Sequence, residues 1–383
     1  MKTTRSTASS AAITPRSRPA FAMGRACSIF GLGLALALPA AATPFSVTNL
    51  VTDDQSANPA QITDPNLKNA WGISHSSTSP FWVSSNGAGL SMIYQVDPLT
   101  NATTKVGLEV TIPGAGNVTG QVFNIGAGTG NFNGDNFLFV SEDGTISGWR
   151  GALGTNAEVL QTASASNSYK GTAISVIGTD AYLYSANFAT GKIDVLKGNA
   201  AAPDLSGTFT DPGIPSGFAP FNIQNLGDTL YVTYAKVGPT GDDEAGPGNG
   251  FVSAFGLQGN FIGRVASNGT LDSPWGLALA PASFAEFAGD LLVGNFGDGR
   301  INAFDKNTDA FVGQLPLEID GLWGLIPGND GKGGSSQAIY FSAGPGDEAH
   351  GLFGVIQVPE PASIALVALA IAMLGVARRR TVS

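Results

Sequence analysis

The chain has 383 residues, of which 13% are charged, 43% are hydrophobic, 52 are glycine and one is cysteine. Few charges with many glycines are typical of an all-β, turn-rich globule with a large core. Between residues 43 and 358, 11 Lys and Arg stand against 28 Asp and Glu. This net charge of about −17 argues against nucleic acid and anionic membranes as partners, and favours divalent cations or a basic protein.

Residues 1–42 are predicted to be a signal peptide. Five basic residues precede the apolar run 29–38, and Ala40-Ala41-Ala42 is a small-residue site for signal peptidase. The mature chain is expected to begin near Thr43, so Cys27 leaves with the leader and no thiol remains. Met23 is an alternative start, and an uncleaved anchor is disfavoured because the apolar run is far shorter than about 20 residues.

Region 43–358 is built from repeats about 50 residues long. Stretch 274–315 contains four short β-type runs separated by Gly, Asp and Asn turns, which is the size of one propeller blade. The stretch opens with three residues, an aromatic, a small and an aliphatic one, and this opening recurs along the chain with substitutions. The six openings are Trp71-Gly72-Ile73, Phe123-Asn124-Ile125, Lys170-Gly171-Thr172, Phe221-Asn222-Ile223, Trp275-Gly276-Leu277 and Trp323-Gly324-Leu325.

This period predicts a six-bladed β-propeller of four-stranded antiparallel blades. A β-sandwich does not need a fixed period, and the coil of a β-helix is much shorter. The sixth unit lacks a fourth strand, whereas the run 45–51 alternates like a strand and has no hairpin partner. We expect this N-terminal strand to complete the last blade and close the ring.

Five residues stand where the second strand of successive blades is predicted to end. Because equivalent loops share one face of a propeller, they are candidate ligand-binding residues, together with His350. The competing interpretation is that Asn before Gly is simply a favoured hairpin residue. The five are Asn86, Glu142, Asn187, Tyr234 and Asn295.

Two acidic loops are expected on that same face. Loop 235–250 is much longer than the equivalent loops of other blades, and loop 344–350 belongs to blade six. Their acids are candidate Ca²⁺ ligands or a docking patch for a basic partner, or they are simply solvated. These acids are Asp242, Asp243, Glu244, Asp347 and Glu348.

No catalytic residues are predicted. His75 and His350 are the only histidines, and no serine stands in a Gly-x-Ser-x-Gly setting after a strand. Trp71, Trp275 and Trp323 open innermost strands, so they are expected to pack near the central channel, or else to offer a stacking platform for a sugar.

The C-terminal segment 359–383 closely resembles the PEP-CTERM sorting signal of bacteria that make extracellular polysaccharide. It has the motif Pro359-Glu360-Pro361, the apolar run 364–377 and the basic tail Arg378-Arg379-Arg380. The resemblance implies export, processing by an exosortase and transient inner-membrane anchoring by a short hydrophobic helix. The run of about 14 residues is short for a full span, and the basic tail fits retention on the cytoplasmic side.

The region 43–358 also resembles the uncharacterised six-bladed propeller proteins that carry this signal. The resemblance lies in Thr63-Asp64-Pro65-Asn66-Leu67, Ala70-Trp71-Gly72-Ile73 and Glu348-Ala349-His350-Gly351, and a more distant one links it to NHL-repeat and gluconolactonase-type propellers. It supports the fold and implies no activity. Two functions follow: a binding or scaffold protein of the envelope or polysaccharide matrix, or a divalent-cation-dependent hydrolase of the lactonase kind.

Overall fold

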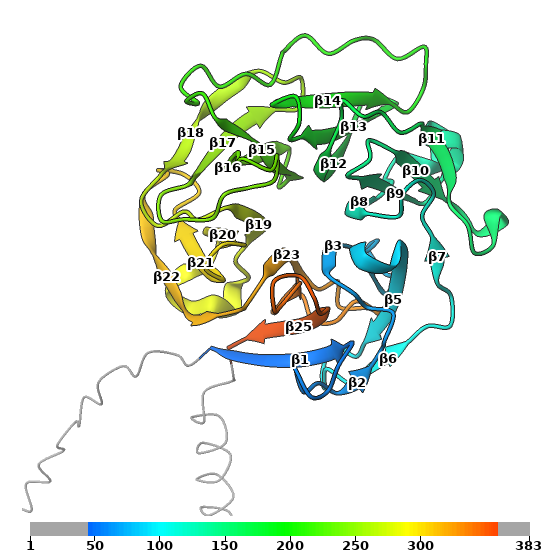
Figure 1. Cartoon of the computed structure of the whole chain (residues 1–383), viewed down its shortest axis with the longest axis vertical. Helices are drawn as coiled ribbons and strands as arrows, with labels where there is room; N and C mark the ends of the chain where they lie inside the picture. The colour runs from blue at the N-terminus through cyan, green and yellow to red at the C-terminus, as the bar shows by residue number, and fades with distance from the viewer. Residues whose placement is uncertain (1–44, 359–383) are drawn as a thin grey trace, which may run out of the picture. The chain divides into compact units, whose positions relative to one another are not determined.

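A computed structural model describes residues 45–358, which form six antiparallel sheets arranged around a central axis (Figure 1). The innermost strand of each blade contacts the innermost strand of the next, and the last contacts the first. The predicted six-bladed propeller is therefore confirmed. The innermost strands of blades one to six are β3 (Ala70–Ser74), β8 (Val118–Phe123), β12 (Tyr169–Ile177), β15 (Phe218–Asn225), β19 (Pro274–Leu279) and β23 (Leu322–Pro327).

Each blade is a meander that runs outward from the axis. The second strands are β4 (Phe81–Ser85), β9 (Phe137–Ser141), β13 (Asp180–Asn187), β16 (Thr229–Lys236), β20 (Leu291–Asn295) and β24 (Ile339–Ala343). The third strands are β5 (Leu90–Val96), β10 (Ile146–Trp149), β14 (Lys192–Lys197), β17 (Gly250–Gly256), β21 (Arg300–Phe304) and β25 (Leu352–Gln357). The outer strands are β6 (Thr103–Lys105), β11 (Glu158–Gln161), β18 (Phe261–Ser267) and β22 (Phe311–Glu318) in blades one, two, four and five, with β7 (Val110–Thr111) also paired to β5.

The chain closes its own ring at blade six. Strand β1 (Ser46–Thr52) pairs antiparallel with β25, and β2 (Ile62–Thr63) adds to it in parallel. Leu50 and Val51 are fully buried in the core that β1 shares with β25. The predicted closure by the N-terminal strand is thus confirmed.

Blade three departs from the four-strand pattern, because its sheet contains only β12, β13 and β14. The following segment 198–217 crosses the outside of the blade without forming a strand. Pro203, Pro212 and Pro215 lie in it, and proline has no N–H to donate to a sheet. Phe209 nevertheless packs into the core between blades three and four.

Close packing at the axis explains the small residue in the repeated opening. A Cβ on Gly120 would lie 2.7 Å from the Thr172 backbone nitrogen, and one on Gly276 would lie 2.8 Å from the Trp323 carbonyl oxygen. Glycine therefore lets neighbouring innermost strands approach each other.

The same geometry corrects the predicted opening of blade two. Phe123 is the last residue of β8, and Gly120 takes the place that Gly72 and Gly171 take in the adjacent blades. The opening is therefore Thr119-Gly120-Gln121. The prediction was wrong because Thr119 replaces the expected aromatic residue, and its hydroxyl donates a hydrogen bond to the Tyr169 carbonyl at 2.7 Å.

Helical structure in the described part is limited to five short 3₁₀ helices: η1 (Asn86–Ala88), η2 (Ala127–Thr129), η3 (Asn131–Gly134), η4 (Gly151–Leu153) and η5 (Ala282–Phe287). None of these helices is long and apolar enough to cross a membrane. The predicted signal peptide and the predicted sorting helix lie outside the described residues.

Candidate functional site

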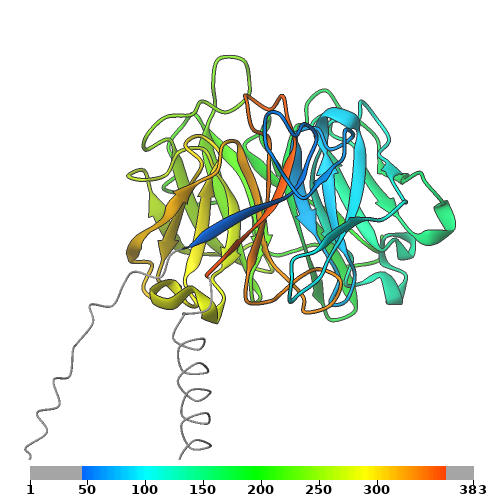
Figure 2. The same ribbon diagram turned by 90° about the horizontal axis from the view of Figure 1, so that it is seen from below.

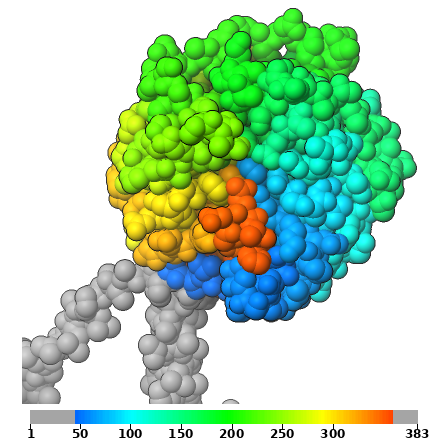
Figure 3. Space-filling view, in the orientation of Figure 1, coloured from blue at the N-terminus to red at the C-terminus, as the bar shows by residue number. Residues whose placement is uncertain are grey.

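The propeller has two chemically different faces. We call the end of the axis where the innermost strands begin the loop face, and the end where they finish the terminal face. Loops 237–249 and 344–351 lie on the loop face, and the latter is the orange segment near the middle of the space-filling view (Figure 3). Strand β1 begins and β25 ends at the terminal face, so Phe45 and Val358 lie there (Figure 2).

An aromatic cluster occupies the axis between the faces. The rings of Trp71 and Trp323 stack with centroids 3.8 Å apart, and Phe296 also stacks on Trp323, with centroids 3.9 Å apart. Trp275 belongs to the same cluster, and its indole N–H donates to the Lys170 carbonyl at 3.0 Å. The three tryptophans therefore pack at the axis, as predicted.

Lys170 is the centre of a polar network on the loop face. Its side chain is 4% exposed, and its ammonium group binds Glu142 and, at 2.9 Å, Asp242. The ammonium also lies 5.5 Å from the ring centroid of Trp71. Burial alone lowers the pKa of Lys170, but the two carboxylates outweigh burial and hold that pKa above its usual value.

Two of the five candidate ligand residues join this network. The Asn86 amide donates to Glu142 at 3.3 Å. The side chains of Asn187 and Asn295 instead bond to the loop that precedes their own blade and to Asp194 and Asp298, respectively. Tyr234 is buried, and burial raises the pKa of its phenol. Asn187 and Asn295 thus lie outside the Lys170 network, and their role as ligand-binding residues stays a prediction.

His350 belongs to a separate group around Asp53. Its Nδ1 lies 3.2 Å from the Asp53 carboxylate, which also accepts from Lys68 and from the Gly351 backbone. Burial raises the pKa of Asp53, but these hydrogen bonds, with that from Lys68 the largest, lower it below its usual value. The group ties β1 to the end of loop 344–351, which is a structural role.

The five predicted acidic ligands are spread over several environments. Asp242 binds Lys170, Glu244 pairs with Lys236 at 2.7 Å, and Asp347 is exposed. Glu348 accepts from Asn69, and burial raises the pKa of both Glu348 and Asp243. Within residues 45–358, no three His, Cys, Asp or Glu side chains are grouped so that they could hold a metal ion. The calcium site stays a prediction.

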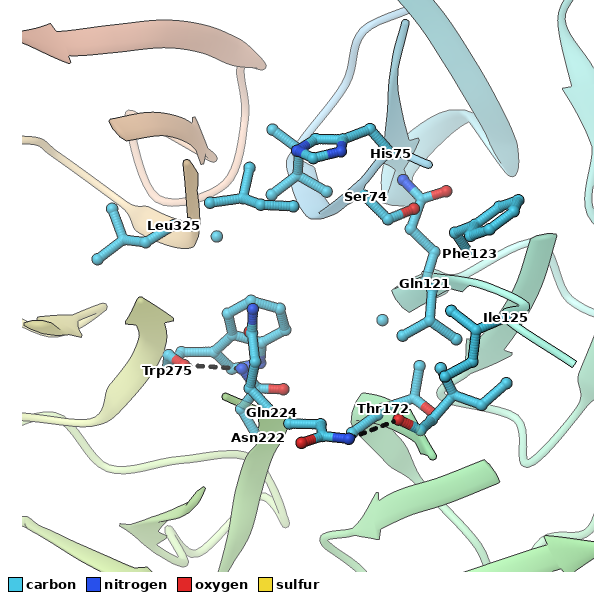
Figure 4. A pocket seen from close by; sticks show the side chains of 18 residues that line it. Ser74, His75, Gln121, Phe123, Ile125, Thr172, Asn222, Gln224, Trp275 and Leu325 are labelled. Atoms are coloured by element: carbon cyan, nitrogen blue, oxygen red, sulfur yellow. Dashed lines mark hydrogen bonds between the residues drawn. The ribbon is translucent and has the colours of Figure 1, made fainter. Parts of the chain in front are cut away.

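A pocket of about 270 Å³ opens along the axis on the terminal face (Figure 4). Its polar lining comes from the middle and the ends of the innermost strands and from His75 just past β3. His75 is the one ionisable residue in it. Trp275 and aliphatic side chains such as Ile174 and Leu325 complete the wall. The polar lining residues are Ser74, His75, Gln121, Thr172, Asn222, Gln224 and Asn225.

Some of these polar groups are already satisfied, and two others have no hydrogen-bond partner among the described residues. Gln121 donates to the Gly72 carbonyl, and both ring nitrogens of His75 lie 2.8 Å from backbone carbonyl oxygens. In contrast, the Ser74 hydroxyl and the Asn225 carbonyl oxygen are buried and have no partner among the described residues. Ser74 is only 6% exposed. Unpaired buried polar groups are unfavourable, so a ligand that these two side chains rotate to meet gains affinity.

The sequence did not point to Lys170 or to this pocket. The one available signal for Lys170 was a charge at a position where other blades carry Trp, Phe or Thr. The pocket residues Ser74, Gln224 and Asn225 are small neutral side chains near strand ends, where they are common whatever the function.

Comparison with known proteins identifies a sorting motif and similar proteins. A family model for the PEP-CTERM protein-sorting motif matches residues 357–380. The uncharacterized protein R648 of Acanthamoeba polyphaga mimivirus is 33% identical over 347 residues, which cover 82% of this chain and 81% of the viral protein. The uncharacterized protein L690 of the same virus is 34% identical over 321 residues, covering 76% of this chain and 80% of that protein.

Among solved structures, the WD40 β-propeller domain of Doa1 aligns with a TM-score of 0.47 and 10% identity, covering 83% of this chain and 98% of that domain. The sorting motif implies an exported protein that is processed by an exosortase and sorted to the cell envelope. By its identity and coverage, this six-bladed propeller belongs to the same protein family as R648 and L690.

Proposed function

We propose that the protein is a binding protein of the cell envelope or of the extracellular polysaccharide matrix, and that it takes a neutral sugar unit into its axial pocket. The observation that carries this proposal is the lining of the pocket, in which hydroxyl and amide groups and one indole surround a cavity without carboxylates. Sugars present many hydroxyl groups and an apolar ring face, so they fit neutral hydrogen-bonding groups beside an aromatic wall.

The size of the pocket limits the ligand. Pockets for small molecules are commonly about 300–1,000 Å³, and this pocket of about 270 Å³ lies just below that range. It suits one sugar unit or the end of a chain better than a long oligosaccharide. The sorting motif supports a matrix ligand, since it implies delivery to the side of the membrane where polysaccharide is found.

The proposal is tested by titrating the exported protein with a panel of neutral mono- and disaccharides in a calorimeter. Asn225→Leu and Gln224→Leu should each weaken binding by about tenfold or more, because each removes hydrogen bonds to the sugar. Asn86→Leu on the loop face is the matched control and should leave the affinity unchanged. Binding that persists in the pocket variants, or that Asn86→Leu abolishes, would contradict the proposal.

The alternative function is a lactonase-like hydrolase. A screen of lactones and esters with and without a chelator distinguishes it from a binding protein, since a cation-dependent hydrolase loses turnover when the cation is removed. Robust turnover that the chelator abolishes would replace the binding proposal.

A further inference from the structure

Apart from Val159 on β11 and Val195 on β14, the exposed large apolar side chains of the described region lie at one end of the propeller. Outer strands begin at the terminal face, and Phe261, Ile262, Phe311 and Val312 are the first residues of β18 and β22. Leu99 is 91% exposed in the turn after β5, and Val47 is at the start of β1. Phe261, Ile262, Phe311 and Val312 are 38%, 59%, 50% and 44% exposed. We call these six residues the apolar rim.

The chain leaves the propeller between the rim residues of blade five and those of blade one. Val358 follows β25 in blade six and packs with Phe45 against the blade's core. Three rim residues flank this exit: Phe311 and Val312 belong to the adjacent blade five, and the Leu99 turn is held beside β25 by a 2.7 Å hydrogen bond from Asn101 to Gln357. The two residues on β18 lie one blade further round. Scattered surface apolar residues need no explanation, but a group around one exit marks an interaction site.

The sequence that follows Val358 limits how far the apolar rim can lie from a membrane. The apolar run 364–377 begins six residues after Val358 and is followed by three arginines. Six fully extended residues reach at most about 20 Å. If the run is inserted in a bilayer, the terminal face must lie within that distance of the lipid surface.

We propose that the terminal face docks on the phospholipid bilayer while the sorting segment is still attached, with the apolar rim in contact with the lipid. The axial pocket opens on this same face, because Ile125, Gln224 and Ile326 at its mouth lie at or beyond the ends of innermost strands. The docked propeller therefore shields its pocket, and cleavage at the sorting motif exposes the pocket. The docking step itself does not depend on what the pocket binds.

Charge determines which lipid the terminal face favours. Asp97, Asp305 and Asp330 lie in turns on this face, and Lys306 and Lys332 only partly offset them. Like charges repel, so docking should be stronger on neutral phosphatidylcholine than on anionic phosphatidylglycerol at low salt. This dependence is opposite to that of a protein held by a basic patch.

Single cysteines test the docked orientation, since Cys27 lies in the leader and residues 43–383 contain no other cysteine. Leu99→Cys reports on the terminal face and Thr240→Cys on the loop face, where residue 240 is exposed. Each variant of chain 43–383 is placed in phosphatidylcholine nanodiscs, and its reaction rate with a soluble maleimide is compared with the rate in detergent. We expect the Leu99→Cys variant to react about tenfold more slowly in nanodiscs, which corresponds to about 1.4 kcal/mol, and the Thr240→Cys variant to be unchanged.

Further variants separate docking from mere proximity. Adding Ile262→Ser and Val312→Ser to the Leu99→Cys variant should restore most of the detergent rate, because both side chains are exposed and dispensable for the core. Equal rates in nanodiscs and detergent, failure of the chain to co-elute with nanodiscs, or insensitivity to the two serines would overturn the proposal. The Leu99→Cys variant is also made in a chain that ends at Val358 and measured without lipid. If its maleimide reaction is slowed just as much there, a second copy of the protein covers this face, and the proposal of lipid docking is overturned.

Discussion

At the scale of single residues, Lys170 is the most informative side chain. It is a buried cation held by two carboxylates of unequal exposure, 24% for Glu142 and 66% for Asp242. Lys170→Met should destabilise the fold by about 1–3 kcal/mol, because it leaves Glu142 without its charge partner. Chemical denaturation measures the loss. The matched control is Lys236→Met, whose exposed pair with Glu244 should contribute less than about 0.5 kcal/mol; equal losses would show that Lys170 is not the centre of the network.

A substitution at Glu348 is expected to raise the stability of the fold, in contrast to Lys170→Met. Glu348 is exposed overall, but burial of its carboxyl raises the pKa above the ordinary value of 4.5, so the ionised form carries a small, solvent-screened penalty in the folded state. Glu348→Gln removes that penalty and keeps an oxygen for the Asn69 amide. We expect the variant to melt higher than the natural protein at pH 8, by no more than about 1 °C because solvent screens this exposed side chain.

The pH dependence checks this explanation of Glu348. Below pH 4.5 the carboxyl is protonated in both folded and unfolded states, so the advantage of Glu348→Gln should vanish there and appear as the pH rises towards the raised pKa. Asp347→Asn changes the net charge equally at an exposed site and serves as the control. An advantage that is the same at pH 4 and pH 8 would contradict the explanation.

At the scale of elements, packing between innermost strands depends on glycine. A Cβ at position 120 would meet the Thr172 nitrogen at 2.7 Å and the Gly171 Cα at 2.9 Å, both backbone atoms that cannot rotate away. Gly120→Ala should therefore lower the free energy of unfolding by about 1–3 kcal/mol. Gly263→Ala, in outer strand β18, meets nothing within 4 Å and should be neutral or slightly stabilising in the same denaturation experiment.

The closing strand makes the second prediction at this scale. Leu50 is fully buried and Val47 is 41% exposed on the same strand β1. Leu50→Ala should cost about 2–5 kcal/mol, as for a core leucine, and Val47→Ala less than about 1 kcal/mol. Similar small effects of both substitutions on thermal melting would mean that β1 does not complete blade six.

Strand order and closure could be predicted from the sequence because they depend on hydrophobic periodicity and on a count of strands. The run 45–51 had no hairpin partner, and blade six lacked an outer strand, so the pairing of β1 with β25 followed. The opening of blade two was misplaced because Thr119 replaces an aromatic residue there. The missing strand of blade three depends on three prolines whose effect a fifty-residue period does not reveal.

The candidate site was less accessible to prediction. Blade equivalence did bring Asn86, Glu142 and Asp242 to one face, where Lys170 joins them. The axial pocket was missed, because neutral amides and a serine at strand ends have no distinctive spacing. Their convergence depends on the order of the blades around the axis and becomes visible only in three dimensions.

At the scale of the whole molecule, the two faces divide the tasks of the protein. The loop face carries the Lys170 network and acidic loops, and the terminal face carries the axial pocket, the apolar rim and the exit towards the sorting motif. Placing the pocket and the exit on one face couples release from the membrane to exposure of the pocket in our proposal.

A crystal structure of the exported protein soaked with the tightest-binding neutral sugar from the panel tests the central claim most directly. We predict density for one sugar unit in the axial pocket, with hydrogen bonds to the Ser74 hydroxyl and the Asn225 carbonyl oxygen, which have no partner within residues 45–358. Sugar bound on the loop face beside Lys170, or an empty axial pocket at saturating sugar, would contradict it.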